Sequence, residues 1–179
     1  DFSGAQKPRG NSVGYRAKTY PKCNCTRNKR LSFQLGHRQI SSPVLLAPLA
    51  GITDLPFRNL VSSFGAGLVV SEMIASGEFL TARPGTRAKA QLGAQLENTS
   101  VQISGREPEP MAEAAKMVAD LGARVIDINM GCPAKKVAGG WSGSALMQVP
   151  DHALKLIEAV VAAVDVPVTL KTRLGWNDD

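Results

Sequence analysis

Short apolar runs alternate with amphipathic segments along most of the chain. The expected strands are the apolar runs Val44–Ala47, Leu68–Val70, Val101–Ile103, Val125–Ile128 and Val168–Leu170. The expected helices lie between them, near Leu55–Phe64, Pro110–Leu121 and Asp151–Val164. The segment 75–98 is rich in Ala, Leu and Lys, which also permits a helix.

Two of these helices have an apolar face with the spacing i, i+3, i+4, i+7 that a buried helix surface requires. In the second helix this face consists of Met111, Ala114, Ala115 and Val118, and in the third of Leu154, Ile157, Val160, Val161 and Val164. Asp151 follows Pro150, which is a favourable place for a helix to begin.

Alternating strands and helices predict a parallel sheet with crossover helices, and continuously apolar strands predict a sheet buried on both faces. A doubly wound sheet and a (β/α)8 barrel both fit. No G-x-G-x-x-G follows the first strand, which weakens the dinucleotide-binding form of the doubly wound sheet. We therefore predict an α/β fold, a (β/α)8 TIM barrel truncated after about five β/α units, because a complete barrel needs about 250 residues.

The overall composition is that of an ordinary globular protein, but the charge is distributed unevenly between residues 1–30 and residues 31–179. Hydrophobic residues make up 44% of the 179 residues and no apolar run reaches membrane-spanning length, so we expect no membrane segment. The net charge is +6, but eight of the 21 Lys and Arg residues lie in residues 1–30 beside one acid. Residues 31–179 hold 13 basic and 14 acidic residues. We predict a disordered basic extension over 1–30 and the catalytic-domain segment over 31–179.

The basic extension has more than one reading. It could bind nucleic acid through phosphates, it could be a disordered or mistranslated leader, and its composition also fits a transit peptide. The chain begins with Asp1, so we expect the true start to lie upstream. Cys23 and Cys25 are too close together to form a zinc site without further ligands, and three cysteines make no disulfide framework. We expect no metal and a cytoplasmic location.

Polar residues follow each apolar run, at the strand ends where a barrel of this kind carries its active site. The five segments are Pro48–Asp54, Ser71–Met73, Gln102–Arg106, Asp127–Pro133 and Lys171–Arg173. The segments APLAGITD, SEM, VQISG, DINMGCPAKKV, SGSALMQ and VPVTLKTRLGW closely resemble the tRNA-dihydrouridine synthases, particularly the bacterial B type. The resemblance runs in order from about Leu31 to the end. Leu49 departs from it, because the family commonly has Met there.

The resemblance implies reduction of the uracil C5=C6 bond in tRNA, with FMN as cofactor and NADPH as reductant. Hydride goes to C6, and the charge that develops must be quenched by a proton at C5. Cys132 is the expected catalytic proton donor, because a thiol with a pKa of about 8.5 is mostly protonated at neutral pH. The resemblance also implies that the rest of the barrel and a helical RNA-binding domain are missing, so we expect this segment alone to be inactive.

Other residues receive roles from the same resemblance. Lys171 is expected beside the N1/C2=O edge of the flavin, and Gln102 at its pyrimidine edge. Pro48, Leu49 and Ala50 are expected to contact the flavin through their backbone. Asn129 either binds the uracil or orders the cysteine loop, and Asp127 is either functional or an inward structural residue.

Basic residues on the same rim are expected to contact tRNA phosphates: Lys135, Lys136, Arg173 and Arg106. His37 and His152 lie away from the strand ends and receive no catalytic role. The whole protein is expected to act as a monomer with tRNA as its partner.

Two alternatives stay open from the residues. The first is an FMN barrel that handles free pyrimidines, such as a dihydroorotate or dihydropyrimidine dehydrogenase, which also places an Asn and a Cys or Ser after the fourth strand. The run GCPAKKVAGGWSGSAL favours the tRNA enzymes. The second is a truncated barrel that binds flavin or RNA without catalysis.

Overall fold

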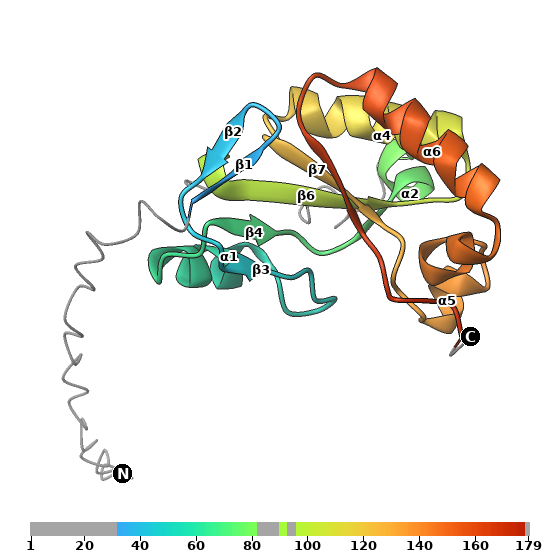
Figure 1. Ribbon diagram of the computed structural model, residues 1–179, viewed down its shortest axis with the longest axis horizontal. Coiled ribbons are helices and arrows are strands. Elements are labelled where there is room, and N and C mark those ends of the chain that lie inside the picture. The colour runs from blue at the N-terminus through green and yellow to red at the C-terminus, as the bar shows by residue number, and fades with distance from the viewer. Residues whose placement is uncertain (1–31, 82–89, 93–95, 178–179) are drawn as a thin grey trace, which may run out of the picture.

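A curved parallel sheet with helices on its outer side forms the body of the protein (Figure 1). The computed structural model describes residues 32–81, 90–92 and 96–177, so the predicted basic extension, with Cys23 and Cys25, lies outside the described residues. The sheet contains β3 (Leu45–Leu46), β4 (Leu68–Val70), β6 (Thr99–Ser104), β7 (Val125–Asn129) and β8 (Val168–Lys171), in that order and all parallel. The short strand β5 (Ile74–Ala75) also pairs with β6.

The strand order decides between the two folds that the sequence allowed. A doubly wound sheet reverses its strand order at a switch point, whereas a barrel adds each new strand on the same side of the previous one. Here each strand of the main path lies beside its successor in the chain, without a reversal. The sheet is therefore about half of a (β/α)8 barrel, which confirms the predicted fold class.

The helices agree with the predicted segments to within two residues at each end. They are α1 (Leu55–Ser63), α4 (Pro108–Asp120) and α6 (Pro150–Ala163). Each begins with proline in its first turn, where the missing N–H costs no helical hydrogen bond. At α1 the carboxylate of Asp54 also accepts a hydrogen bond from the N–H of Phe57 at 3.0 Å, which caps the helix.

The described part of the segment 75–98 contains the short helix α2 (Ser76–Leu80) and the 3-10 turn η2 (Leu96–Asn98). The predicted helix over the rest of this segment falls largely on 82–89 and 93–95, which lie outside the described residues. Two further short elements follow β7, namely α5 (Lys135–Ala138) and the 3-10 segment η3 (Gly143–Gln148).

The main hydrophobic core lies between the outer face of the sheet and the helices α2, α4 and α6. The four predicted apolar residues of α4 are all buried in it. The predicted apolar face of α6 is only partly correct: Val160 is buried and Ile157 and Val164 pack against the core, but Leu154 and Val161 are exposed. Leu156 is buried in their place, so the buried face is rotated from the predicted one. From the sheet, Val101 and Ile103 of β6 and Ile126 and Ile128 of β7 point into the same core.

The opposite, inward face of the same strands is polar. Side chains alternate between the two faces of a strand, so Gln102 and Ser104 of β6 lie opposite to the core residues beside them, as do Asp127 and Asn129 of β7. All four are buried. The prediction that the sheet is buried on both faces is confirmed for β4, β6 and β7, whereas β3 and β8 are partly exposed.

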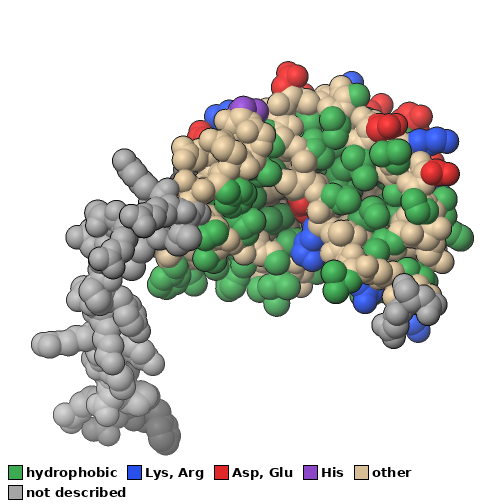
Figure 2. Space-filling model, viewed as in Figure 1, with side chains coloured by type: hydrophobic (Ala, Val, Ile, Leu, Met, Phe, Trp, Pro, Cys, Tyr) green, Lys and Arg blue, Asp and Glu red, His purple; other side chains and the backbone are tan. Residues whose placement is uncertain are grey.

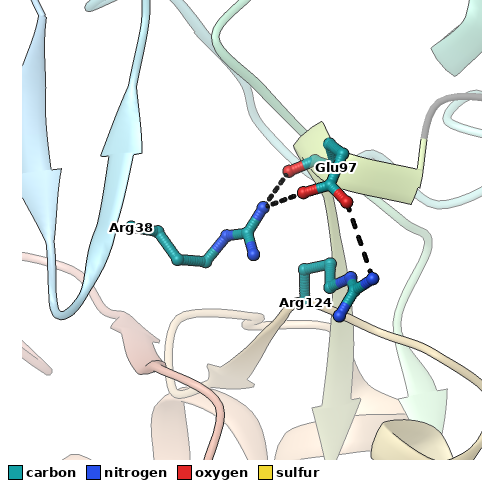
Figure 3. A network of polar contacts seen from close by, with 3 residues as sticks. All are labelled: Arg38, Glu97 and Arg124. Atoms are coloured by element: carbon teal, nitrogen blue, oxygen red, sulfur yellow. Dashed lines mark hydrogen bonds and ion pairs between the residues drawn. The ribbon is translucent and has the colours of Figure 1, made fainter.

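A β-hairpin that the sequence analysis did not predict covers the amino ends of the strands. It consists of β1 (Phe33–Leu35) and β2 (Arg38–Ile40), and Ile40 packs against Leu68 and Val125, the first residues of β4 and β7. Arg38 reaches Glu97 at 2.7 Å, and Arg124 approaches the same carboxylate at 3.5 Å (Figure 3). The hydrogen bond from Arg38, followed by the charges of Arg124 and Arg38, lowers the pKa of Glu97.

Exposed hydrophobic side chains gather over α1 and β3, along one side of the sheet (Figure 2). They include Val44, Leu45, Leu49, Ile52, Leu60 and Phe64. None of the helices within the described ranges has the length and apolar character that crossing a bilayer requires.

Candidate functional site

Six of the residues that the sequence singled out line one cleft at the carboxyl ends of the strands. The cleft has a volume of about 210 Å³, and its walls include Pro48, Ala50, Gln102, Asn129, Cys132 and Lys171. These residues come from the ends of β3, β6, β7 and β8, so the cleft depends on the parallel register of the sheet. Met73, Gly131 and Pro133 complete its walls.

The floor of the cleft is a row of hydrogen-bonded side chains from three neighbouring strands. Register pairs Gln102 with Asp127 and Asp127 with Thr169. The amide Nε2 of Gln102 donates to Asp127 Oδ2 at 2.6 Å, and the hydroxyl of Thr169 donates to Asp127 Oδ1 at 2.6 Å. Asp127 is thus an inward structural residue that holds the Gln102 amide in one orientation.

Burial dominates the electrostatics of Asp127. Desolvation raises the pKa of its carboxyl above the ordinary value of 3.8, while the hydrogen bonds from Thr169 and Gln102 and the charge of Lys171 act in the opposite direction. The carboxyl therefore holds its proton more tightly than an exposed aspartic acid would.

The cysteine loop is attached to this row through Asn129. The Asn129 Nδ2 donates to Gln102 Oε1 at 2.9 Å, and its Oδ1 accepts from the backbone N–H of Cys132 at 3.1 Å and of Gly131 at 3.3 Å. Of the two roles that the sequence left open for Asn129, the geometry supports ordering of the cysteine loop. These hydrogen bonds involve the backbone of the loop, so the partly exposed thiol of Cys132 remains at the wall of the cleft.

The segment η3 holds the other side of the cysteine loop. The backbone N–H of Ser144 donates to the carbonyl of Cys132 at 3.1 Å. Gly143 has a φ of +61°, and a Cβ built on it would lie 2.7 Å from the Cys132 carbonyl oxygen and 2.8 Å from Val137 Cγ1. Only glycine fits there without strain, so the GSALMQ segment packs directly against the loop that carries the thiol.

The loop after β3 supplies the small residues of the cleft wall. Pro48 and Ala50 line the cleft, but Leu49 does not. The backbone N–H of Leu49 donates to Thr53 Oγ1 and its carbonyl accepts from Ile52 and Thr53, so both of its backbone groups are engaged within the turn. The Glu72 carboxylate accepts a hydrogen bond from the N–H of Gly51 and thereby ties this turn to the loop after β4.

The predicted phosphate-binding residues lie outside this cleft. Lys135 borders an apolar groove between Trp141 and Trp176, whereas Lys136 faces a second cleft together with Arg106. Arg173 is exposed and its side chain lies beside Gly131 of the cysteine loop. The structure therefore distributes the four cations around the rim instead of gathering them in one patch.

Several residues of the site were not identified from the sequence. Thr169 is one example, because its hydroxyl holds Asp127. Ser71 was named only within a strand-end segment, and the structure adds that its hydroxyl accepts a hydrogen bond from the N–H of Gln102 at 3.1 Å. Arg58 is another, because it is buried in α1 and donates to the carbonyls of Thr53 and Gln91; its burial lowers the pKa of its guanidinium. The available signal for the strand residues was polar side chains at alternate positions of otherwise apolar strands.

Neither histidine lines the cleft at Cys132. His37 lies in the turn between β1 and β2, and the ring Nε2 of His152 in α6 contacts the carbonyl oxygen of Arg106 at 2.5 Å. Over the part of the chain that the structure describes, no three His, Cys, Asp or Glu side chains converge in a way that could hold a metal ion.

Comparison with known proteins gives one consistent result. The family model described as dihydrouridine synthase matches residues 45–179. A "Probable tRNA-dihydrouridine synthase" of Rhodobacter capsulatus is 70% identical over 151 residues, which cover 83% of this chain and 46% of the relative. A protein of the same description from Rhizobium leguminosarum is 61% identical, covering 78% of the chain and 44% of the relative.

The B type is also represented among the relatives. The "tRNA-dihydrouridine synthase B" of Xanthomonas campestris is 52% identical over 147 residues, which cover 82% of the chain and 44% of that protein. The chain thus spans less than half the length of these relatives.

Proposed function

The chain belongs to the dihydrouridine synthase family, and we propose that the whole protein reduces the C5=C6 bond of specific uridines in tRNA to 5,6-dihydrouridine, with FMN as cofactor and NADPH as reductant. The observation that carries the proposal is the cysteine loop. Asn129 and Ser144 hold the backbone of Cys132 from both sides and leave its thiol at a cleft that Lys171 and Gln102 also line.

The walls of this cleft suit the edge of a flat, polar ring system. Pro48 and Ala50 are small enough for close approach, and Lys171 supplies a cation. Gln102 already uses one N–H toward Asp127 and one lone pair toward Asn129, so one N–H and one lone pair of its amide remain for a ligand. FMN bound here would supply the hydride that C6 of the uracil receives.

The residues of the chain would then complete the reaction. The Cys132 thiol donates its proton to C5, and the Asn129 hydrogen bonds keep the loop from swinging the thiol away. Lys171, on the neighbouring strand end, favours the negative charge that accompanies reduction at this rim. Asp127 contributes indirectly, since it fixes Gln102 and through it Asn129.

Binding of tRNA would use the cations around the rim. Lys135, Lys136, Arg106 and Arg173 are all exposed, as side chains that contact phosphates must be. We propose that the protein acts as a monomer in the cytoplasm, without a metal.

Two measurements on the full-length protein test this proposal. Titration with FMN should give a bound-flavin absorbance spectrum, and Lys171→Ala should weaken the binding or slow flavin reduction. NADPH oxidation by the flavin-loaded protein should be stimulated by unmodified tRNA and not by free uracil. Stimulation by free uracil alone would instead identify an enzyme of free pyrimidines, and absence of any flavin spectrum would reject the flavin-dependent reaction.

A further inference from the structure

A second cleft, which the proposed reaction does not use, lies next to the first at the same rim. Its volume is about 560 Å³, within the range of about 300–1,000 Å³ that small-molecule sites occupy. Met73 forms part of the wall of both clefts. The remaining walls come from α2, the loop between β6 and α4, and the segment around α5. A ligand there would therefore lie one wall away from the Cys132 thiol.

Two serine hydroxyl groups are open to this second cleft. Ser76 and Ser104 are each only 4% exposed as whole residues, but neither hydroxyl oxygen is one of the fully buried, unpartnered polar atoms of the described residues. A ligand in the cleft can therefore take the place of the water that would otherwise hydrogen-bond to them. Each hydroxyl can both donate and accept, so the pair suits a ligand with mixed polar groups.

The backbone keeps the cleft open beside these hydroxyls. A Cβ built on Gly105 would lie 2.4 Å from Ser76 Oγ and 2.8 Å from Met111 Sδ, so a side chain could not fit between them. Gly77, which follows Ser76 in α2 and also lines the cleft, has open space where a Cβ would stand, because no atom lies within 4 Å. The first glycine is thus required for packing, whereas the second leaves room in the cleft itself.

The charges at the cleft mouth nearly balance. Arg106 forms an ion pair with Glu107 at 3.3 Å, and both line the cleft together with Glu78 and Lys136. A site for a bare phosphate would need an excess of cations, which this mouth lacks. Hydroxyls and carboxylates beside two cations instead fit the ribose hydroxyls and base edge of a nucleoside, with Lys136 available for its phosphate.

We propose that this second cleft binds the nucleotide directly next to the target uridine in tRNA, and so contributes to the choice of uridine. The inference rests on the proposed function. If the target uridine lies in the cleft at Cys132, the nucleotides on either side of it are one step away along the RNA backbone. The two clefts are separated by the side chain of Met73, so one of these nucleotides could reach the second cleft. Sequence-specific RNA recognition commonly uses unstacked bases held in such pockets.

The experiment fills the cleft without disturbing the first one. In Gly77→Leu the new side chain enters the open space inside the cleft, and leucine is a good helix former. Its control is Ala162→Leu, which adds a leucine on the exposed face of α6, away from both clefts. Both full-length variants are assayed with intact tRNA and with tRNA that lacks the base on the 5′ or the 3′ side of the target uridine.

We expect Gly77→Leu to lower kcat/KM for intact tRNA by about tenfold, the effect of losing one well-held base. Ala162→Leu should match the wild type, and NADPH-driven flavin reduction without tRNA should be unchanged in both. Removal of the neighbouring base from the tRNA should lower kcat/KM of the wild type by a similar factor. It should not lower kcat/KM of Gly77→Leu any further. If removal of the base lowered kcat/KM equally in the wild type and in Gly77→Leu, the assignment would be overturned. Slower flavin reduction in Gly77→Leu would overturn it as well.

A second variant guards against misfolding of the first. Ser104→Ala removes a hydroxyl that is open to the cleft, so it should leave the melting temperature unchanged and lower kcat/KM for tRNA severalfold. Unchanged kcat/KM in Ser104→Ala would also reject the site. If the wild type reduces no uridine in tRNA, the proposed function fails together with this inference. If the wild type reduces uridine in tRNA and both Gly77→Leu and Ser104→Ala do so equally well, this inference is rejected and the proposed function stands.

Discussion

At the scale of single residues, the site is a chain of short polar contacts that ends at one thiol. Thr169 and Asp127 orient Gln102, Gln102 orients Asn129, and Asn129 holds the backbone of Cys132. The sequence pattern placed Gln102, Asn129 and Cys132 near strand ends, and the family resemblance gave them their expected roles. The link made by Asp127 depends on register across strands that lie 25 residues apart in the chain, which local patterns do not reveal.

The first prediction concerns Cys132. In the full-length protein, Cys132→Ala should leave flavin reduction by NADPH nearly intact, because that step does not use the thiol proton. Reoxidation by unmodified tRNA should slow about 10²–10⁴-fold, the usual value of a positioned acid. Stopped-flow absorbance of the pre-reduced protein measures this step. Cys132→Ser should also be slow, since a hydroxyl is a far weaker acid; a wild-type rate in either variant would remove Cys132 from the mechanism.

The second prediction concerns the hydrogen bonds that Asp127 accepts from Gln102 and Thr169, which bear on both the stability of the fold and the position of the cysteine loop. Asp127→Asn keeps an oxygen acceptor for Gln102, so most tRNA turnover should remain. Asp127→Ala leaves the donors of Gln102 and Thr169 unsatisfied in a buried place, which should cost about 1–3 kcal/mol of stability and loosen the cysteine loop. Parallel kcat and melting measurements test this. Equal turnover in the Ala and Asn variants would show that the row does not position the loop.

The third prediction follows from the raised pKa of Asp127. Burial makes the folded state hold this proton more tightly than the unfolded chain, so its contribution to stability is present below the ordinary value of 3.8 and is lost as pH rises through the higher folded pKa. Asp127→Asn has no such proton. Its unfolding free energy relative to the wild type should therefore increase with pH above 3.8 and then level off, as denaturant titrations across pH can measure. A difference that is constant with pH would contradict the assigned direction.

At the scale of elements, the sequence pattern located the helices and strands well and their ends less well. β6 was predicted as Val101–Ile103 but extends over Thr99–Ser104, because its flanking polar residues are buried inside the barrel. The hairpin around Gly36 was missed, since strands of three residues give no apolar run, although Gly36 has the positive φ of +59° that a tight turn uses. The 3-10 segment η3 has no periodic signal; its role comes from contact with Cys132.

The fourth prediction tests that contact. Gly143→Ala places a methyl group against the Cys132 carbonyl and forces alanine into a left-handed conformation, which together should cost about 1–3 kcal/mol. The cysteine loop must shift, so tRNA turnover should fall more than flavin binding does. Gly122→Ala is the control, because it also forces alanine into a left-handed conformation, at a φ of +98°, but its Cβ would meet Leu92 at an ordinary 3.6 Å, away from the cysteine loop. Equal turnover in both variants would show that η3 does not hold the loop.

At the scale of the whole molecule, half a barrel leaves its sheet unclosed. Within the described residues β8 pairs only with β7 and β3 only with β4, and Leu45 and Leu170 on these outer strands are 46% and 39% exposed. Exposed apolar strand edges favour pairing with other chains. The sequence predicted a truncated barrel from the number of β/α units, whereas the hydrophobic surface over α1 and β3 became apparent only from the three-dimensional arrangement (Figure 2).

The last prediction is that a polypeptide of residues 1–179 alone self-associates and binds FMN weakly. Its outer strands offer unpaired N–H and C=O groups next to apolar side chains, and it lacks the loops after the seventh and eighth strands that usually hold phosphate. Size-exclusion chromatography with light scattering and an FMN titration measure both properties. In Leu170→Lys a charge stands on the outer strand β8, so this variant should remain monomeric to higher concentration without gaining FMN affinity. A cooperative monomeric melt with tight FMN binding in the unsubstituted polypeptide would mean that half of the barrel already forms a complete folding and binding unit.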